Sequence, residues 1–282
     1  MIAQGVAQVL RNRRVLFGVS VLGLMVVLAA GARWISPHDP LEQDLLNTLT
    51  LPGIAGGDHA FPLGADSLGR DILSRLIYGT RVALTVAFVA ALLAGLLGSM
   101  LGLLAGYLGR WVDTAISRLV DVWMSFPPVL LSIVLAAVLG AGLRTVVIAI
   151  VVIDWTRFCR VVRAEVLVQK SRDYVASAVS IGLTPRRILL GEVLPNIVPL
   201  LLTLFTLEMG IAIVVEAILS FVGLSVSSGQ ATWGGMIAEG RQYVNQAWWL
   251  MALPTGCVIV AVLAMNALGD GLRDVLDPVK RR

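Results

Sequence analysis

Four apolar runs, each long enough to cross a lipid bilayer as a helix, constrain the fold of this chain more than any other feature. They cover residues 15–32, 82–106, 197–222 and 250–268. The shortest has 18 residues. As an α-helix it would extend roughly 27 Å, close to the thickness of a hydrocarbon core. Charged residues make up 14% of the 282 positions, against about a quarter in soluble domains. We therefore expect an all-α polytopic membrane protein whose surroundings are a lipid bilayer.

The apolar run at residues 15–32 follows a basic stretch, as a secretory signal would. Ala30 and Ala32 also have the small-x-small spacing of a cleavage site. The run is long for the apolar part of a signal peptide, which has about 7–15 residues. We expect a retained membrane anchor.

Residues 129–158 allow two interpretations, one long helix or a hairpin of two spans folded at residues 140–144. The hairpin places 16 of the 22 Lys and Arg on the side of the N-terminus, whereas a single span leaves 6 there and strands Arg144 in the bilayer. Because basic residues concentrate on the cytoplasmic side, the count favours the hairpin. It predicts six transmembrane helices with both termini in the cytoplasm. The net charge of +4 reflects this topology and does not indicate a nucleic-acid partner.

The six-span topology leaves residues 33–81 and 225–247 as external loops. Within the first loop, residues 66–78 have apolar side chains at helical spacing, and Asp66 or Ser67 would cap the helix. We expect an interfacial helix there. An ordinary solvated face would also explain its charged residues, which are Arg70, Asp71 and Arg75.

Ionisable residues inside the apolar runs are the candidates for a translocation path, because burying one in hydrocarbon costs at least a few kcal/mol. Glu208 and Glu216 lie in the run at residues 197–222. They would line a hydrophilic path, or each would pair with a basic or hydroxyl group of a neighbouring helix. The sequence favours neither alternative. Asp154 precedes Arg157 by one helical turn, which predicts a local ion pair.

A stripe of glycines runs along the second apolar run. Its members are Gly95, Gly98, Gly102 and Gly106. Small residues at this spacing let two membrane helices approach closely. We expect the stripe to be a packing surface.

Sequence signatures of enzymes are missing. The chain has two lysines, Lys170 and Lys280, and Gln169 and Ala164 stand where a Walker A motif before Lys170 requires glycines. Any ATP must therefore be bound by a partner, and we expect no cofactor in this chain.

The two cysteines and the two histidines lack the spacing of a metal or disulfide site. Cys159 and Cys257 lie far apart in apolar surroundings, and His38 and His59 share one polar loop. We expect buried spectator thiols, structural or solvated histidines, and no metal.

The segment at residues 173–199 is polar and basic, although it lies between two apolar blocks. It resembles the cytoplasmic signature of permease subunits of bacterial ABC importers, in the dipeptide, oligopeptide and nickel group. That signature is EAA, three residues, Gly, nine residues, Ile, one residue, Leu-Pro. It falls on Ala176, Ser177, Ala178, Gly182, Glu192, Leu194 and Pro195, and the departures are Ala176, Ser177 and Glu192.

The resemblance extends over most of the chain. PLGADSLGRDILSRLIYGTRVAL, residues 62–84, resembles the group's external segment, and residues 106–127 are similar to its cytoplasmic turn into the third span. Residues 233–243 and 266–278 resemble the last loop and the tail. We expect residues 1–60 to form a tail, the first helix and an external loop, and residues 61–282 to form the permease core.

The resemblance implies a type I ABC importer permease fold in the bacterial inner membrane, with a cytoplasmic coupling helix between the fourth and fifth spans. It implies a second homologous permease subunit, two cytoplasmic ATPase subunits that bind ATP and Mg, and an extracytoplasmic solute-binding protein. The residues expected to couple to the ATPase are Asp173, Tyr174, Ala176, Ser177, Ala178, Ile181, Gly182, Pro185, Leu194 and Pro195. The candidate contacts for the binding protein are Asp66, Gly69, Arg70, Asp71, Trp233, Gly234 and Arg241.

The local sequence is consistent with such a coupling helix. Asp173 would cap it, and Tyr174 and Ile181 would offer apolar contacts. Gly182 would end it with positive φ, and Pro185 suits the first turn of the next helix.

The resemblance makes di- and oligopeptides the expected solutes and implies a non-catalytic subunit. Nickel, metal chelates and glutathione are alternatives, because close relatives with the same signatures carry them. Two other classes are an ion-coupled secondary transporter and a membrane-embedded enzyme that uses Glu208 or Glu216. Transport by the chain alone under an ion gradient would identify the secondary transporter.

Overall fold

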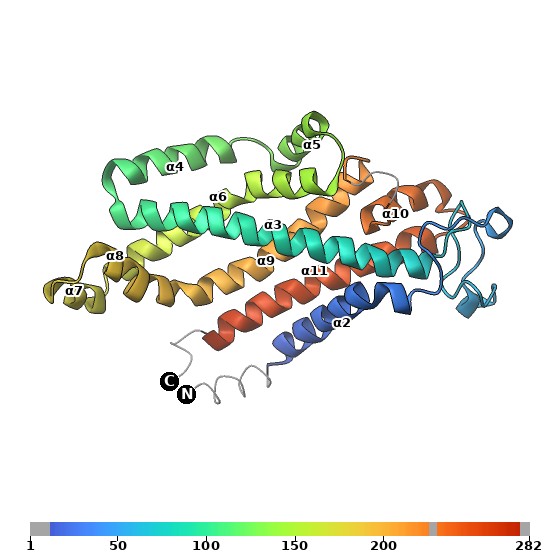
Figure 1. Cartoon of the computed structure of the whole chain (residues 1–282), viewed down its shortest axis with the longest axis horizontal. Helices are drawn as coiled ribbons and strands as arrows, with labels where there is room; N and C mark the ends of the chain where they lie inside the picture. The colour runs from blue at the N-terminus through green and yellow to red at the C-terminus, as the bar shows by residue number, and fades with distance from the viewer. Residues whose placement is uncertain (1–11, 226–229, 277–282) are drawn as a thin grey trace.

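The computed structural model describes residues 12–225 and 230–276, which form an elongated bundle of helices (Figure 1). The long helices are α2 Arg13–Ile35, α3 Ile72–Leu108, α6 Leu143–Lys170, α9 Leu194–Phe221 and α11 Trp249–Leu276. The shorter ones are α4 Arg110–Met124, α5 Pro128–Leu139, α7 Asp173–Ser180, α8 Pro185–Ile188 and α10 Trp233–Gly240. Short 3-10 turns occur at Leu45–Asn47, Gly53–Ala55 and Arg241–Tyr243, and a π-helical turn at Leu189–Val193.

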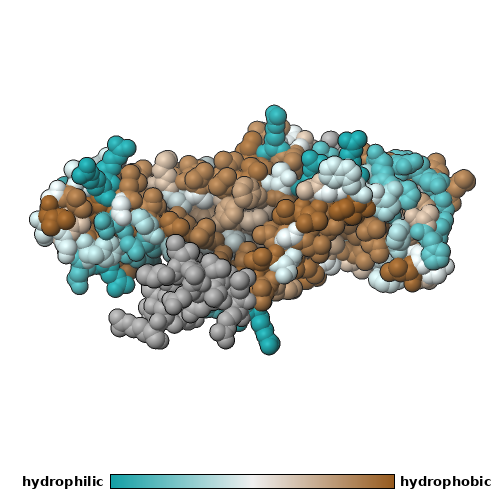
Figure 2. All heavy atoms as spheres, turned by 60° about the horizontal axis from the view of Figure 1, so that its bottom comes forward, coloured by the Kyte–Doolittle hydropathy of each residue, from teal (hydrophilic) through white to brown (hydrophobic). Residues whose placement is uncertain are grey.

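Four helical segments of the described chain are long and apolar enough to cross a membrane. They are α2, α3, the continuous stretch Pro185–Phe221 that ends with α9, and α11. A fifth candidate is the pair α4 and α5, which is bent by 84° at its break. Figure 2 shows hydrophobic side chains over the long middle of the molecule and hydrophilic ones gathered at both ends. A helical multi-pass architecture is thus confirmed. The sixth span, expected in the first half of α6, stays a prediction.

The chain breaks within residues 129–158 at the place expected for the hairpin. α5 ends at Leu139, α6 begins at Leu143, and Gly140 between them has a φ of 87°. The second arm is longer than predicted, because α6 continues to Lys170 as a polar extension of the bundle.

The helix expected from residue 66 begins later, at Ile72. Asp71 is its N-cap, and its carboxylate accepts a hydrogen bond of 2.8 Å from the Ser74 backbone N–H. The helix is not a separate interfacial element either, because it continues for 37 residues as α3. The apolar residues from Ile72 onward lie in the helix as expected, but the capping carboxylate is Asp71 rather than Asp66.

The glycine stripe packs α3 against α6, as the sequence predicts. A Cβ atom on Gly98 would lie 2.2 Å from the carbonyl oxygen of Trp155, and one on Gly102 would lie 2.6 Å from that of Cys159. Neither position has room for a side chain, so the two backbones touch directly. This contact joins the two helices along the middle of the bundle.

Candidate functional site

α7 projects at one end of the bundle, beyond the ends of α6 and α9 (Figure 1). One of its faces is fixed, because Val175 and Ala178 are buried with residues of α6 and α9. Its other side is open. Val179 is 60% exposed and Ile181 is 76% exposed. α7 therefore offers an apolar surface on a helix that the rest of the chain holds in place.

The turn after α7 depends on Gly182, which has a φ of 81°. The Gly182 N–H donates to the Val179 carbonyl at 3.0 Å, and the Leu183 N–H donates to the Ala178 carbonyl at 3.1 Å. These two bonds form a Schellman motif, which satisfies the last carbonyls of a helix with backbone groups alone. Ala176, in place of the signature Glu, therefore removes no bond that closes this turn.

Two expectations for α7 need correction. Asp173 is the first residue of the helix and not its cap, which is Arg172. A carboxylate in the first turn still interacts favourably with the helix dipole. Tyr174 is partly buried, and its hydroxyl donates to the Gln169 side chain at 2.6 Å. Burial raises the pKa of this phenol, so the group stays a donor that anchors α7 to α6. Pro185 begins α8, as expected.

A π-helical turn, Leu189–Val193, connects α8 to α9 and was not foreseen. Its signal was the Leu-Pro pair of the signature, Leu194 and Pro195. Pro195 has no N–H, so the carbonyl of Gly191 lacks its usual α-helical donor, and an irregular turn there is favoured. Leu194 is partly buried, whereas Ser177, Pro185 and Pro195 are exposed.

At the opposite end, ion pairs join the loop between α2 and α3, and the first turn of α3, to α10. Arg70 Nε lies 2.7 Å from Asp66 Oδ2, and Arg70 Nη2 lies 2.8 Å from Glu239 Oε2. Arg75 Nη1 contacts the carboxylates of both Asp66 and Glu239. Arg70 and Arg75 are 8% and 4% exposed, and Asp71 is 1% exposed. The solvated-face interpretation of these charges is therefore wrong.

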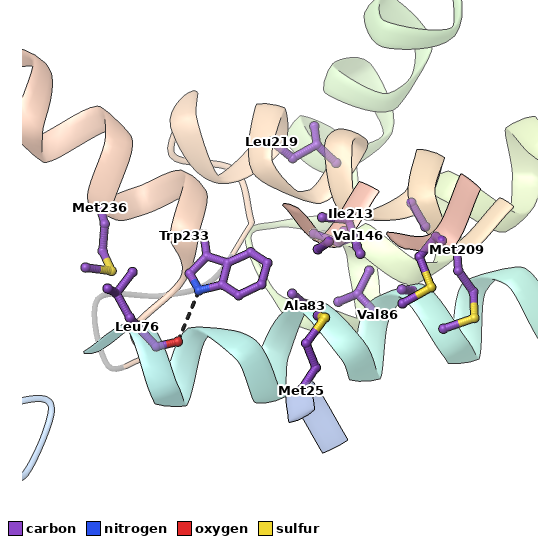
Figure 3. Packing of buried hydrophobic residues seen from close by; sticks show 14 of the residues in the cluster. Met25, Leu76, Ala83, Val86, Val146, Met209, Ile213, Leu219, Trp233 and Met236 are labelled. Carbon is purple, nitrogen blue, oxygen red and sulfur yellow. Dashed lines mark hydrogen bonds between the residues drawn. The ribbon is translucent and has the colours of Figure 1, made fainter. Parts of the chain in front are cut away.

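The other candidate contacts for the binding protein are also packed within the structure, with the exception of Arg241. Gly69 has a φ of 72°, and a Cβ atom there would lie 1.7 Å from the Asp44 carbonyl oxygen. Trp233 is 3% exposed and donates its indole N–H to the Leu76 carbonyl at 3.1 Å (Figure 3). Gly234 packs against α9, and Arg241 is exposed. A contact between these residues and a binding protein stays a prediction.

A third cluster lies midway along the bundle. Arg157 pairs with Asp154 at 3.8 Å, as expected, and more closely with Glu208 at 3.2 Å. Glu208 is 1% exposed. Sequence reasoning missed the Arg157–Glu208 pair, because 51 residues separate its members.

Glu216, which lies eight residues after Glu208 on α9, accepts hydrogen bonds from two hydroxyl groups. The Ser220 hydroxyl donates to it at 2.6 Å and the Ser225 hydroxyl at 3.2 Å. This contact matches the hydroxyl-pairing alternative in chemistry, although Ser220 lies on the same helix.

The histidines and cysteines lie as separate groups. His38 stacks on Phe61, with ring centroids 5.2 Å apart, and its Nδ1 is 3.8 Å from Asp71 Oδ2. Cys159 and Cys257 are free. Within residues 12–225 and 230–276, no three His, Cys, Asp or Glu side chains lie together in a group that would hold a metal ion.

Comparison with known proteins gives two matches to protein-family models. Residues 98–282 match the family described as binding-protein-dependent transport system inner membrane component. Residues 4–52 match the N-terminal TM domain of oligopeptide transport permease C.

Relatives match over almost the whole chain. The di/tripeptide transport system permease protein DppC of Pseudomonas aeruginosa (strain UCBPP-PA14) is 40% identical over 95% of this chain and 88% of its own length. The glutathione transport system permease protein GsiD of Shigella flexneri serotype 5b (strain 8401) is 41% identical over 90% of this chain and 83% of its own. Among solved structures, a chain of the inward-facing MetNI methionine ABC transporter superposes with a TM-score of 0.61 at 19% identity, over 73% of this chain and 98% of that one.

Proposed function

Because the chain belongs to the family of binding-protein-dependent transport system inner membrane components, we propose that it forms half of the translocation path of an ATP-driven importer of short peptides. The observation that carries the coupling part of this proposal is α7. It presents Val179 and Ile181 to solvent from a helix whose opposite face is packed. An apolar surface held in this way suits a partner protein, because fixed apolar groups bind with little loss of conformational entropy.

We place α7 in the cytoplasm, where an ATPase subunit would receive it. Arg14 Nη1 lies 3.8 Å from Asp274 Oδ2, so α2 begins at the same end of the bundle at which α11 finishes. An even number of spans would produce this arrangement, and the positive-inside count puts that end in the cytoplasm. Closure of the ATPase subunits would then tilt the helices as rigid bodies through α7. The path would lie between this chain and a second homologous permease subunit.

The external end would receive the solute-binding protein. The surface of this chain at that end includes Arg241. The ion pair between Arg70, in the loop before α3, and Glu239, in α10, holds the surface in a fixed position. We retain the division into an N-terminal part, residues 1–60, and a permease core, residues 61–282, as part of the same proposal.

The names of the relatives support peptides as solutes, since the Pseudomonas relative is a di/tripeptide permease. Glutathione is the second candidate, because the Shigella relative is a glutathione permease of similar identity. Both solutes are short, carry a free amino group and carry carboxylates.

The test of the solute is uptake by the complete transporter in proteoliposomes. We expect labelled dialanine to enter when ATP is present on the cytoplasmic side, and unlabelled dipeptides to compete. Competition by glutathione at much lower concentration than by any dipeptide would support the second candidate. If neither solute enters, the proposal of a peptide importer is wrong.

A further inference from the structure

Three charged side chains and a cavity meet midway along the bundle. Arg157 and Glu208 lie at the centres of α6 and α9, two helices of 28 residues each. The ring of Phe158, next to Arg157, lies 3.3 Å from where a Cβ atom on Gly95 would be, in the middle of the second apolar run. The cluster therefore lies level with the middle of the apolar run of α3, and on α6 it falls where the apolar first half meets the polar extension.

The Arg157 side chain is 46% exposed at this depth, although it is charged. A charged group in the bilayer core faces protein or water, because contact with lipid tails costs several kcal/mol. The face of α6 that carries Arg157 must then border a partner subunit or a water-filled path.

The cluster is one positive charge short of neutrality when both of its acids are ionised, so without a further cation its two carboxyl groups share one proton. Asp154 and Glu208 contribute two carboxylates, and Arg157 contributes one guanidinium. Glu208 Oε1 accepts no hydrogen bond from an N–H or hydroxyl group in the described part of the chain, although Glu208 is 1% exposed, and the other polar neighbour of the Glu208 carboxyl besides Arg157 is the Asp154 carboxyl. A buried acceptor without a donor is costly, so a cationic donor would satisfy both deficits.

A cavity of about 320 Å³ lies beside Glu208, between α6, α9 and α11. Its volume is roughly ten times the share of one water molecule in the liquid, so it has room for a small organic group. Asn266 adds an amide to its wall. The apolar part of the wall consists of Phe158, Leu204, Leu207 and Ile211.

We propose that this cavity binds the terminal ammonium group of the solute during its passage, with Glu208 as the principal acceptor. An ammonium group brings one positive charge and three donors, of which Glu208 Oε1 takes one and the Asn266 amide oxygen takes another. The apolar wall contacts the first side chain of the solute. The assignment rests on the proposed peptide importer and specifies which end of the peptide this subunit recognises.

A carbodiimide reports on this site without any transport. Dicyclohexylcarbodiimide modifies protonated carboxyl groups in apolar surroundings, and mass spectrometry locates the product. The purified complete transporter, without ATP, is treated alone, with dialanine, with N-acetyldialanine, or with sodium chloride of equal ionic strength. Glu216, which its serines cover, serves as the internal reference.

We expect modification of Glu208 without solute, and a decrease of about tenfold with dialanine at ten times its dissociation constant. N-acetyldialanine and sodium chloride should change it by less than about twofold, because neither brings an ammonium donor. Three results would overturn the proposal: no modification of Glu208 without solute, no protection by dialanine, or equal protection by all three additions.

Uptake by two matched variants gives a second measure. Glu208→Gln keeps the shape of the side chain and removes its charge, whereas Asp121→Asn alters an exposed pair with Arg160, 3.1 Å long. We expect Glu208→Gln to lower the amount of dialanine moved per ATP by about tenfold or more, and Asp121→Asn to match the wild type. Wild-type coupling in Glu208→Gln would contradict the assignment. Failure of wild-type uptake with intact labelling and protection would instead reject the importer function and leave the ammonium site standing.

Discussion

Arg75 and Glu239 are 164 residues apart in the sequence and share two hydrogen bonds, Nη1 to Oε2 at 2.7 Å and Nη2 to Oε1 at 3.2 Å. Together with Arg70 and Asp66 they hold α10 against the start of α3. The network combines residues of the loop before α3, of α3 itself and of α10, which look unrelated in the sequence. It gives this end of the bundle a fixed shape.

Glu239→Ala should destabilise the protein, because it leaves Arg70 and Arg75 short of an acceptor in a buried setting. We expect a loss of about 3 kcal/mol, at the low end for a broken buried pair, since the Glu239 side chain is 41% exposed. Denaturant titration of the purified complex measures it. Asp121→Ala, which breaks the exposed pair with Arg160, is the control and should cost at most about 1 kcal/mol. Equal losses would show that the network contributes no more than a surface pair.

Gly98→Ala should weaken the contact of α3 with α6, because the new methyl carbon would lie 2.2 Å from the Trp155 carbonyl oxygen. Backbone shifts of this kind cost about 1–3 kcal/mol. Gly23→Ala is the matched control, since nothing lies within 4 Å of a Cβ atom there. The yield of monodisperse complex after detergent extraction should fall for Gly98→Ala alone. Similar yields for both variants would contradict the direct backbone contact.

Ile181→Asp should uncouple ATP hydrolysis from uptake by placing a charge on the exposed end of α7. An anchor residue at a protein interface typically contributes about 2 kcal/mol or more, which predicts at least about a tenfold loss of uptake. Leu46→Asp adds the same charge at the opposite end of the bundle, where Leu46 is 95% exposed, and is the control for folding and assembly, judged by the yield of intact complex. Normal uptake by Ile181→Asp would argue against docking through this surface.

Gly182→Val should reduce binding-protein-stimulated ATPase activity more than Gly182→Asn does. Both replace a glycine with a φ of 81°. A β-branched residue pays roughly 1–2 kcal/mol or more in this region, whereas Asn tolerates it better. If the two variants behave alike, the effect comes from size at the interface and not from the backbone turn.

Sequence patterns predicted the elements that depend on local chemistry. The glycine stripe, the break at Gly140 and the positive φ of Gly182 all follow from what glycine alone permits, and each is present. The apolar runs located α2, α3, α9 and α11 to within a few residues at most ends. The exceptions are the start of α3, which lies ten residues before residue 82, and the end of α11, which lies well past residue 268.

Contacts between distant parts of the chain could not be predicted from the sequence. Arg70 and Arg75 look like part of an exposed charged face until Glu239 is brought beside them by the packing of α10. Arg157 was assigned to its neighbour Asp154, because its partner on α9 is visible only in three dimensions. The members of such pairs are far apart in the sequence, and the pattern of a single sequence does not indicate which distant residues meet.

The most direct test of the account is energy dependence in proteoliposomes that contain this chain alone or the complete transporter. We predict that the complete transporter accumulates labelled dialanine only when ATP is hydrolysed on the cytoplasmic side, and that the chain alone transports nothing under a proton or sodium gradient. Accumulation by the chain alone under such a gradient, without ATPase subunits, would contradict the account and identify a secondary transporter.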